Sequence, residues 1–557
     1  PALLQRCLFH QRTPMIRHGI FQQARFRARR CVQTRARLVL CVLALTVGAA
    51  GAATDADLTR WVDPLIGTDT SYELSRGNTF PAITRPWGMT SWAPQTGSYE
   101  NALFYEYKAE TFTGIRATHQ ASVWMGGYGE FSFMAVTGNP GLLPQQRASP
   151  FAHAQEWAHP ESYSVDLPRY GLRLELTPTS HAAILRVQST DSDTVTFVVD
   201  PHPPGTEIQL LPTDRLLLAM TQTQMGSAAA NFRSFLAAQF DRAPVDFGTW
   251  TDSTSRRGST HDQGQHSGAW VRFADVRARP LVIRLGTSFL GADVAIQSME
   301  QELGSHGFDE IADEGRQEWN RLLGRARITG GSQERRVVFY SALYRSLLFP
   351  RDWQEIDGNG DIVHFSPYDG LVHPGPMVAD FGLWDAFRSH VPLYFLLYPN
   401  RGRTVLQGLV NCYLEGGWFP KWLNPGYSWG MPGTQAEILF ADGWAKGVRD
   451  FNVEAAYEGL RQNATEPGEA GQGRQGLEAY EGLGYVPGDL VDGSVSRTLE
   501  FAYGDYSLGV LARALGHDQD ADRFLARAGN WRHVFDASTG FVRGRKRDGS
   551  WMALDPY

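Results

Sequence analysis

Two short segments of this chain, 382–388 and 415–422, place tryptophan beside charged side chains within single turns of predicted helix. The side chains concerned are Trp384, Asp385, Arg388, Trp418 and Lys421. A pyranose ring stacks its C–H face on an indole, while charged groups bind its hydroxyls. The two segments therefore predict a sugar-binding site.

Each of these residues also has a purely structural interpretation. Trp384 and Trp418 fit helix packing, and Asp385 fits a capped turn. Arg388 lies one turn after Trp384, where it can orient Asp385 or bind sugar. Lysine is common on surfaces, so Lys421 is the weakest candidate of the second segment. The sequence leaves these alternatives open.

Composition and charge exclude some classes of partner. The 557 residues are 42% hydrophobic and 20% charged, which is an ordinary balance for a globular protein with more than one core. The net charge is −7, without a basic stripe. We therefore expect no nucleic-acid partner and no attraction to anionic membranes.

Residues 1–53 have the pattern of a leader. Several arginines between 25 and 37 precede the apolar run 38–47, and small residues follow at 48–53. This pattern predicts a secretory signal peptide cleaved near Ala52, and its apolar run is short for a bilayer span. We expect a secreted or periplasmic protein without stable membrane insertion after cleavage. Of the four cysteines only Cys412 follows the leader, and its apolar surroundings predict a small core residue.

Residues 54–307 favour strands. Segments with alternating or β-branched apolar residues are bounded by Gly, Pro and Asp, which is typical of a β-sandwich. The clearest predicted strands are 131–136, 172–176, 183–187, 194–199, 269–273 and 281–285. The Ser-, Thr-, Gly- and His-rich stretch 249–268 is predicted to be a long loop.

After about residue 308 the hydrophobic period changes to 3.6, which indicates helices. Residues 308–333 are predicted to be a linker region with a helix at 311–323. Residues 334–557 are predicted to form antiparallel helix pairs without strands between them, as in a partial (α/α)₆ toroid. The predicted helices are 334–349, 380–397, 402–415, 434–449, 452–463, 494–515 and 518–533. About seven helices are fewer than six pairs require, so we expect a truncated toroid.

An ordered series of motifs resembles glycoside hydrolase family 92, whose members are calcium-dependent exo-α-mannosidases. The resemblance covers nearly the whole chain after residue 60. Besides the two tryptophan segments, the matching motifs are 62–68, 77–81, 86–89, 118–126, 431–434, 496–503 and 535–541. The family fold is an N-terminal β-sandwich, linking helices and a C-terminal (α/α)₆ barrel, with the active site at their junction.

The resemblance implies hydrolysis of terminal α-mannose from mannosides, N-glycans or mannan oligosaccharides with inversion. In such a reaction an acid protonates the leaving oxygen, and a base about 6.5–9.5 Å away activates water. A calcium ion would hold sugar hydroxyls. In the family the acid follows the segment matching 555–556, and the base and most calcium ligands lie further on. We therefore assign no catalytic residue here, and the metal ligands are unknown.

The resemblance also suggests roles for individual residues. Trp384 and Asp385 match positions that contact the terminal mannose. His119 and Trp124 occupy a loop that helps to form the leaving-sugar subsite, although a lone histidine is more often structural. Asn78, in a Gly-Asn-Thr turn, is a ligand candidate or simply a turn residue.

Other functions stay open at this stage. A catalytically inactive mannose-binding remnant would keep Trp384 and Asp385 without the chemistry. Some family members act on mannose-phosphate-mannose diesters, and the sequence does not distinguish this substrate from a simple mannoside. A disaccharide phosphorylase on a similar toroid has less support, because no anion-binding cluster stands out.

Overall fold

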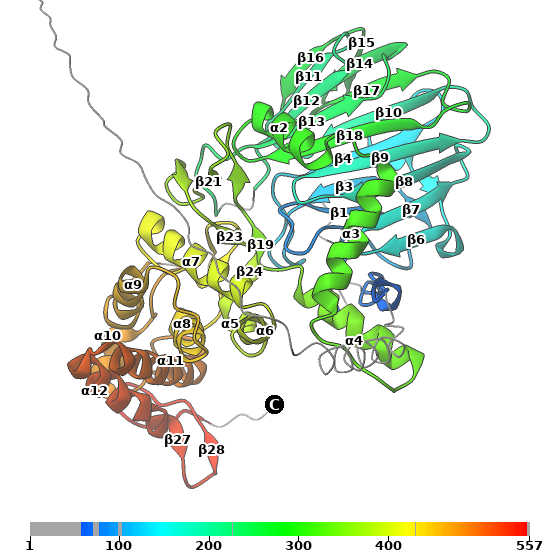
Figure 1. Ribbon diagram of the computed structural model, residues 1–557. Coiled ribbons are helices and arrows are strands. Elements are labelled where there is room, and N and C mark those ends of the chain that lie inside the picture. Colours follow the sequence, from blue (N-terminus) through cyan, green and yellow to red (C-terminus); the bar gives the residue numbers. More distant parts are fainter. Residues whose placement is uncertain are drawn as a thin grey trace, which may run out of the picture. The chain divides into compact units, whose positions relative to one another are not determined.

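The computed structural model describes residues 57–70, 77–97, 103–224, 227–428, 430–469 and 471–553. The predicted signal peptide lies outside the described residues. Residues 57–557 group into one unit by their contacts, so the β-rich and helical parts can be discussed together. Figure 1 shows the two large sheets in the blue-to-green part of the chain and most of the helices in the green-to-red part, where only short strands lie.

Two antiparallel sheets form the N-terminal part. The seven-stranded sheet runs in the order β1 (Ser91–Gln95), β3 (Gly114–Thr118), β4 (Phe131–Val136), β10 (Val195–Pro201), β17 (Ser267–Phe273), β14 (Asp246–Thr251) and β15 (Thr254–Arg257). The nine-stranded sheet runs in the order β16 (His261–Gly264), β11 (Thr206–Leu211), β12 (Leu216–Thr221), β13 (Ser234–Phe240), β18 (Leu281–Ser288), β9 (Ala182–Ser189), β8 (Leu172–Pro178), β7 (Ser162–Leu167) and β6 (Glu156–His159).

One hydrophobic core joins these sheets, which confirms the predicted β-sandwich. Phe133 and Phe197 of the first sheet and Leu185 and Phe240 of the second belong to the same buried cluster. All six predicted strands are present. Burying apolar faces from both sheets against each other is what fixes the inward side of each strand.

The predicted loop at 249–268 is wrong. This stretch contains the second half of β14, all of β15 and β16, and the start of β17. The four residues of β15 are all exposed, and β15 and β16 are edge strands of their sheets. An exposed edge strand needs no apolar face. The polar composition of this stretch therefore gave no sign that its backbone pairs in a sheet.

Two helices connect the sandwich to the helical part. Helix α2 (Ala292–Leu303) packs on β18, β13 and β9, and α3 (Phe308–Leu323) follows it. A Cβ at Gly286 would collide with the Ala295 carbonyl oxygen and lie 2.8 Å from Cβ of Met299. The missing side chain at Gly286 therefore lets α2 approach the sheet.

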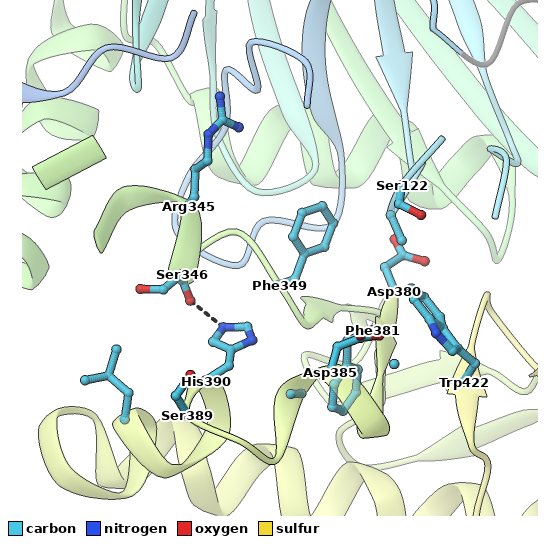
Figure 2. Close-up of a pocket in the computed structure, with 14 residues that line it drawn as sticks. Ser122, Arg345, Ser346, Phe349, Asp380, Phe381, Asp385, Ser389, His390 and Trp422 are labelled. Atoms are coloured by element: carbon cyan, nitrogen blue, oxygen red, sulfur yellow. Dashed lines mark hydrogen bonds between the residues drawn. The ribbon is translucent and has the colours of Figure 1, made fainter. Parts of the chain in front are cut away.

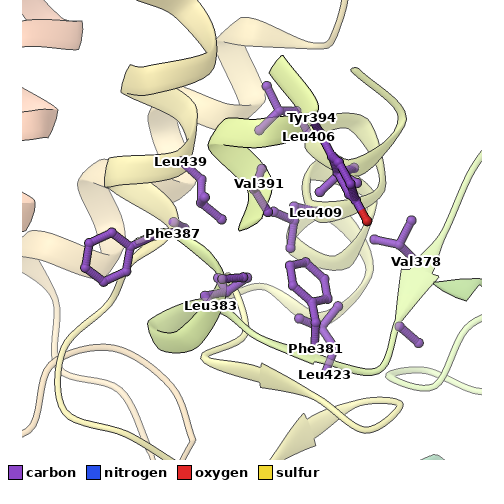
Figure 3. Close-up of a cluster of buried hydrophobic side chains, with 14 of the residues drawn as sticks. Val378, Phe381, Leu383, Phe387, Val391, Tyr394, Leu406, Leu409, Leu423 and Leu439 are labelled. Carbon is purple, nitrogen blue, oxygen red and sulfur yellow. The ribbon is translucent and has the colours of Figure 1, made fainter. Parts of the chain in front are cut away.

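The helical part is built from helices with short strands between them. The helices are α4 (Gln333–Ser346), α5 (Leu383–Ala386), α6 (His390–Leu397), α7 (Pro399–Gly416), α8 (Ala436–Ala445), α9 (Val453–Thr465), α10 (Leu477–Leu483), α11 (Ser494–Leu515) and α12 (Asp518–Arg527). They do not close a barrel within the described residues. Leu406, Leu409 and Leu439 lie in their shared core together with Val391 and Tyr394 (Figure 3).

The absence of strands in this half was predicted wrongly. Short pairs lie between α4 and α8, namely β19 (Arg351–Asp352) with β23 (Val378–Ala379), β20 (Glu355–Ile356) with β21 (Ile362–Phe365) and β22 (Val372–Pro374), and β24 (Phe381–Gly382) with β25 (Trp422–Leu423) and β26 (Tyr427–Ser428). The predicted helix 380–397 is divided into β24, α5 and α6. Strands of two to four residues are too short to show a period.

Two further expectations concern Cys412 and membranes. Cys412 is fully buried on α7, where its Sγ contacts Sδ of Met377. Burial raises the pKa of the Cys412 thiol, which keeps it protonated and unreactive. Among the described residues, none of the helices is both long and apolar enough to cross a bilayer.

Candidate functional site

A cavity of about 580 Å³ lies where a loop of the sandwich meets the helical part. Its lining comes from both, with Ala121 and Ser122 contributed by the sandwich loop. Figure 2 shows Asp380 and Trp422 on one side and Ser346 and His390 on the other. We call this the first cavity, and its remaining lining residues are Arg345, Phe349, Phe381, Gly382, Asp385, Ala386, Ser389 and Leu393.

A second cavity, of about 610 Å³, is lined by the same sandwich loop and by the segment after β25. Its lining residues are Trp124, Met125, Ser227, Asn424, Tyr427, Ser428, Gly430, Met431, Pro432 and Arg497. A Cβ at Gly430 would lie 3.2 Å from Cδ1 of Trp422, so a residue that lines the second cavity packs against one that lines the first. The amide of Asn424 donates to the Met125 carbonyl at 2.8 Å and anchors the loop to the helical part.

Asp380 is a buried residue in the wall of the first cavity that connects the sandwich to the helical part. Its carboxylate accepts a hydrogen bond from Tyr128 Oη at 2.7 Å and pairs with Arg351 Nε at 2.8 Å. Arg351 also donates to Ser91 Oγ and to the Gln120 carbonyl, so sandwich and helical segments meet at this ion pair. Burial raises the pKa of Asp380 to about 7, although Arg351 and Tyr128 lower it. Its φ of 66° is unusual for a residue with a side chain.

Trp384, Asp385 and Arg388 lie together on and just after α5. The Arg388 guanidinium stacks 4.4 Å from the Trp384 ring centroid. Both residues donate to the carboxylate of Glu500 on α11, Trp384 Nε1 at 3.2 Å and Arg388 Nη2 at 3.1 Å. Asp385 is exposed and lines the first cavity. Burial raises the pKa of Asp385, and Arg388 lowers it.

Of this group only Asp385 lines the first cavity, and Trp384 and Arg388 are not among the lining residues of either cavity. The volume of the first cavity is suited to small ligands. Within the described residues, no hydrogen bond or ion pair engages the Asp385 side chain. An unpaired carboxylate at a cavity surface is free to accept hydrogen bonds from the hydroxyls of a ligand.

Comparison with known proteins identifies the family. Residues 61–288 match the glycosyl hydrolase family 92 N-terminal domain, and residues 294–557 match the glycosyl hydrolase family 92 catalytic domain. A family 92 inverting mannosidase from Bacteroides thetaiotaomicron is 34% identical, with a TM-score of 0.88 over 90% of this chain and 69% of that one.

The chain belongs to glycosyl hydrolase family 92. It is therefore a glycoside hydrolase by family, as its motifs predicted. A family 92 α-mannosidase from the same bacterium, solved with mannoimidazole, is 25% identical, with a TM-score of 0.79 over 90% of this chain and 67% of that one. A protein of Arthroderma benhamiae named an uncharacterized secreted glycosidase is 24% identical over 588 residues, 93% of this chain and 69% of the relative.

In this family 92 chain the predicted loop residues divide into two groups. Trp124 is 68% exposed and lines the second cavity. His119 is fully buried, where its Nδ1 meets the Tyr128 carbonyl at 2.8 Å and its Nε2 meets Thr90 Oγ1 at 3.1 Å. Burial lowers the pKa of His119 to about 3, so the ring is neutral. Its position favours a role in supporting the loop over sugar contact.

Trp418, Lys421 and Asn78 are not among the lining residues of either cavity. Trp418 is half-buried, and a Cβ at Gly473 would lie 3.1 Å from its ring, which favours packing. Lys421 is buried rather than on the surface. Asn78 adopts a φ of 52° and its N–H donates to Thr70 Oγ1, which favours the turn interpretation.

A buried ionic network underlies the site and was not identified from the sequence. Arg474 pairs with Asp505 at 2.6 Å and with Glu437 at 3.2 Å, and all three side chains are fully buried. Thr434 Oγ1 accepts from Arg474 Nε at 3.2 Å and donates to Glu437 at 2.7 Å. This network fixes the 431–434 motif against α11. No local pattern marks Arg474, because its partners come from other segments.

A calcium site is not evident in the described residues. Among them, no group of three or more His, Cys, Asp or Glu side chains is arranged to hold a metal ion. We derive no step of the reaction through this ion.

Lys421 leads to a prediction about stability. Burial and Arg497 lower the pKa of Lys421 to about 8, against an ordinary value of 10.5, although Glu437 raises it. Between these two values the unfolded chain binds the proton and the folded chain does not, so stability rises with pH in that window. We expect Lys421→Met to be more stable than wild type by up to about 3 kcal/mol at pH 7. The difference should shrink between pH 8 and 10.5.

Urea unfolding at pH 7, 9 and 10.5 measures this difference. Lys108→Met is the matched control, because Lys108 is 74% exposed in its pairing with Asp69. A Lys421→Met protein that is less stable at pH 7, or whose difference from wild type does not change with pH, contradicts the prediction.

Proposed function

We propose that this protein is an exported exo-α-mannosidase that removes terminal α-mannose from glycans or mannan oligosaccharides with inversion. Support comes from family membership and from mannosidase relatives that are 34% and 25% identical. The secreted relative supports export. We propose calcium as the metal on the resemblance alone.

One observation carries the substrate class. Asp385 faces the first cavity without a partner among the described residues, one residue from an indole held by Glu500. A carboxylate beside an ordered aromatic ring is suited to a hexose. The carboxylate accepts hydrogen bonds from the sugar hydroxyls, and the ring packs against the C–H face of the sugar. The adjoining second cavity, with Trp124 at its edge, is suited to the sugar or aglycone that leaves.

The proposal assigns binding and orientation to this chain's described residues. Asp385 accepts sugar hydroxyls, Trp384 and Arg388 lie beside it, and the loop 119–126 closes both cavities on the sandwich side. The inverting reaction needs an acid and a base on opposite faces of the sugar. We assign neither role to a residue of this chain.

The test compares two proteins. The gene product, expressed to its own stop codon, should release mannose from 4-nitrophenyl α-mannoside, and proton NMR should show the β-anomer first. The chain 1–557 should bind mannose in calorimetry. Binding without hydrolysis by the full gene product would instead identify a mannose-binding protein. The absence of both mannose binding and mannoside hydrolysis would refute the proposal.

A further inference from the structure

Glu500 accepts hydrogen bonds from three side chains, which come from two segments of the chain. One oxygen accepts from Trp384 Nε1 at 3.2 Å and from Arg388 Nη2 at 3.1 Å, and the other accepts from Gln435 Nε2 at 3.2 Å. The Glu500 side chain is only 15% exposed, whereas that of Arg388 is 48% exposed. Charge-assisted hydrogen bonds of this kind are stronger than neutral ones. One carboxylate thus fixes α5 and the N-terminus of α8 to α11.

The packing around Glu500 is specific. A Cβ at Gly433 would lie 2.8 Å from Cβ of Glu500, and Gly433 has a φ of 91°. A side chain at 433 would therefore displace α11 or the carboxylate. Gln435 Nε2 also donates to the Pro432 carbonyl at 2.7 Å, and Pro432 lines the second cavity. The same carboxylate is connected to the walls of both cavities.

Arg388 has two carboxylates within reach of its position. Asp385 precedes it by three residues, and residues at this spacing are neighbours on a helical turn. The guanidinium nevertheless pairs with Glu500 and stacks on Trp384. Asp385 consequently keeps its oxygens free on the surface of the first cavity. The two carboxylates compete for one cation, and Glu500 holds it.

We propose that Glu500 is a positioning residue, which holds Arg388 away from Asp385 and fixes the Trp384 ring, so that Asp385 is left free to bind the sugar. The inference rests on the proposed function and extends it to a residue that touches no substrate. Without Glu500, Arg388 turns toward Asp385 and occupies the oxygens that a mannose hydroxyl would use.

The test is a double-mutant cycle in the full gene product, with 4-nitrophenyl α-mannoside as substrate. Glu500→Ala should lower kcat/KM about 10-fold, mainly through KM, because Asp385 binds sugar in the ground state as well. In the Arg388→Ala background the same substitution should cost less than about 3-fold, because no guanidinium remains to block Asp385. Calorimetric mannose affinity should follow KM.

Two further variants test whether the loss of activity is specific to the Glu500 carboxylate. Glu500→Gln keeps an acceptor for the indole and should fall between wild type and Glu500→Ala, and it replaces the alanine variant if that one fails to fold. Glu478→Ala, which removes an exposed carboxylate of α10, should be unchanged. Equal losses in both Arg388 backgrounds, or no loss in either, overturn the positioning role. A wild type that neither hydrolyses nor binds mannosides instead refutes the proposed function itself.

Discussion

Asp385→Ala is expected to lower kcat/KM for α-mannoside hydrolysis by about 100-fold. A hydrogen bond to a charged group contributes about 1.5–3 kcal/mol, and a carboxylate oriented toward a hexose makes one or two of them. Since about 1.4 kcal/mol corresponds to a factor of ten, the loss approaches two orders of magnitude. Thermal stability should not fall, because Asp385 is exposed and has no intramolecular partner among the described residues.

Two comparisons make this measurement specific. Asp385→Asn keeps the shape but loses the charge, and should retain more activity than the alanine variant. Asp450→Ala removes an exposed carboxylate, 88% accessible in its pair with Arg403, and should leave kcat/KM unchanged. Activity of Asp385→Ala within threefold of wild type would exclude Asp385 from sugar binding.

Arg474→Met is expected to have the largest effect on stability, a loss of about 4 kcal/mol in the free energy of unfolding. The substitution removes the ion-pair partner of Glu437, whose carboxylate is fully buried. Burial already raises the pKa of Glu437, and Arg474 opposes that rise. Asp505 keeps Arg527 Nε at 2.9 Å and Tyr480 Oη at 3.0 Å, so Glu437 carries most of the cost.

Urea unfolding of matched variants measures this cost. Arg403→Met removes a half-exposed arginine that pairs with Asp450, and should change stability by less than about 1 kcal/mol. Adding Glu437→Gln to Arg474→Met should recover part of the loss, because the amide is cheaper to bury than the carboxylate. A loss below 1 kcal/mol, or no recovery in the double variant, would show that the network is not what stabilises this region.

Much of the architecture was predictable because buried strands and helices show a characteristic spacing of apolar residues in the sequence. Strands such as β4 and β10 are buried along their whole length and are mostly apolar, and α3 carries an apolar face at helical spacing. Exposed or very short elements do not show this spacing. The exposed edge strand β15 has no apolar face, and the two-residue strands of the helical half are too short to show any period.

The candidate site was predicted in part. Trp384, Asp385 and Arg388 are neighbours in sequence, so their types and spacing indicated a polar and aromatic wall. The same reasoning failed to distinguish Trp124 from His119, five residues apart, one of which lines a cavity while the other lies in the core. Exposure at this scale depends on how the loop is seated, which sequence spacing does not specify.

The sequence by itself determined the two kinds of secondary structure, the resemblance to the family and the juxtaposition of Trp384, Asp385 and Arg388, because each depends on residues that are close together in the chain. Only the tertiary structure brought Glu500 to Trp384 across 116 residues, and Tyr128 to Asp380 across 252. Both contacts join charged or polar groups whose partners are set by the packing of distant elements. A buried carboxylate needs hydrogen-bond donors, and these can come from segments that are distant in sequence. The residues next to the carboxylate in the sequence therefore do not reveal its partners.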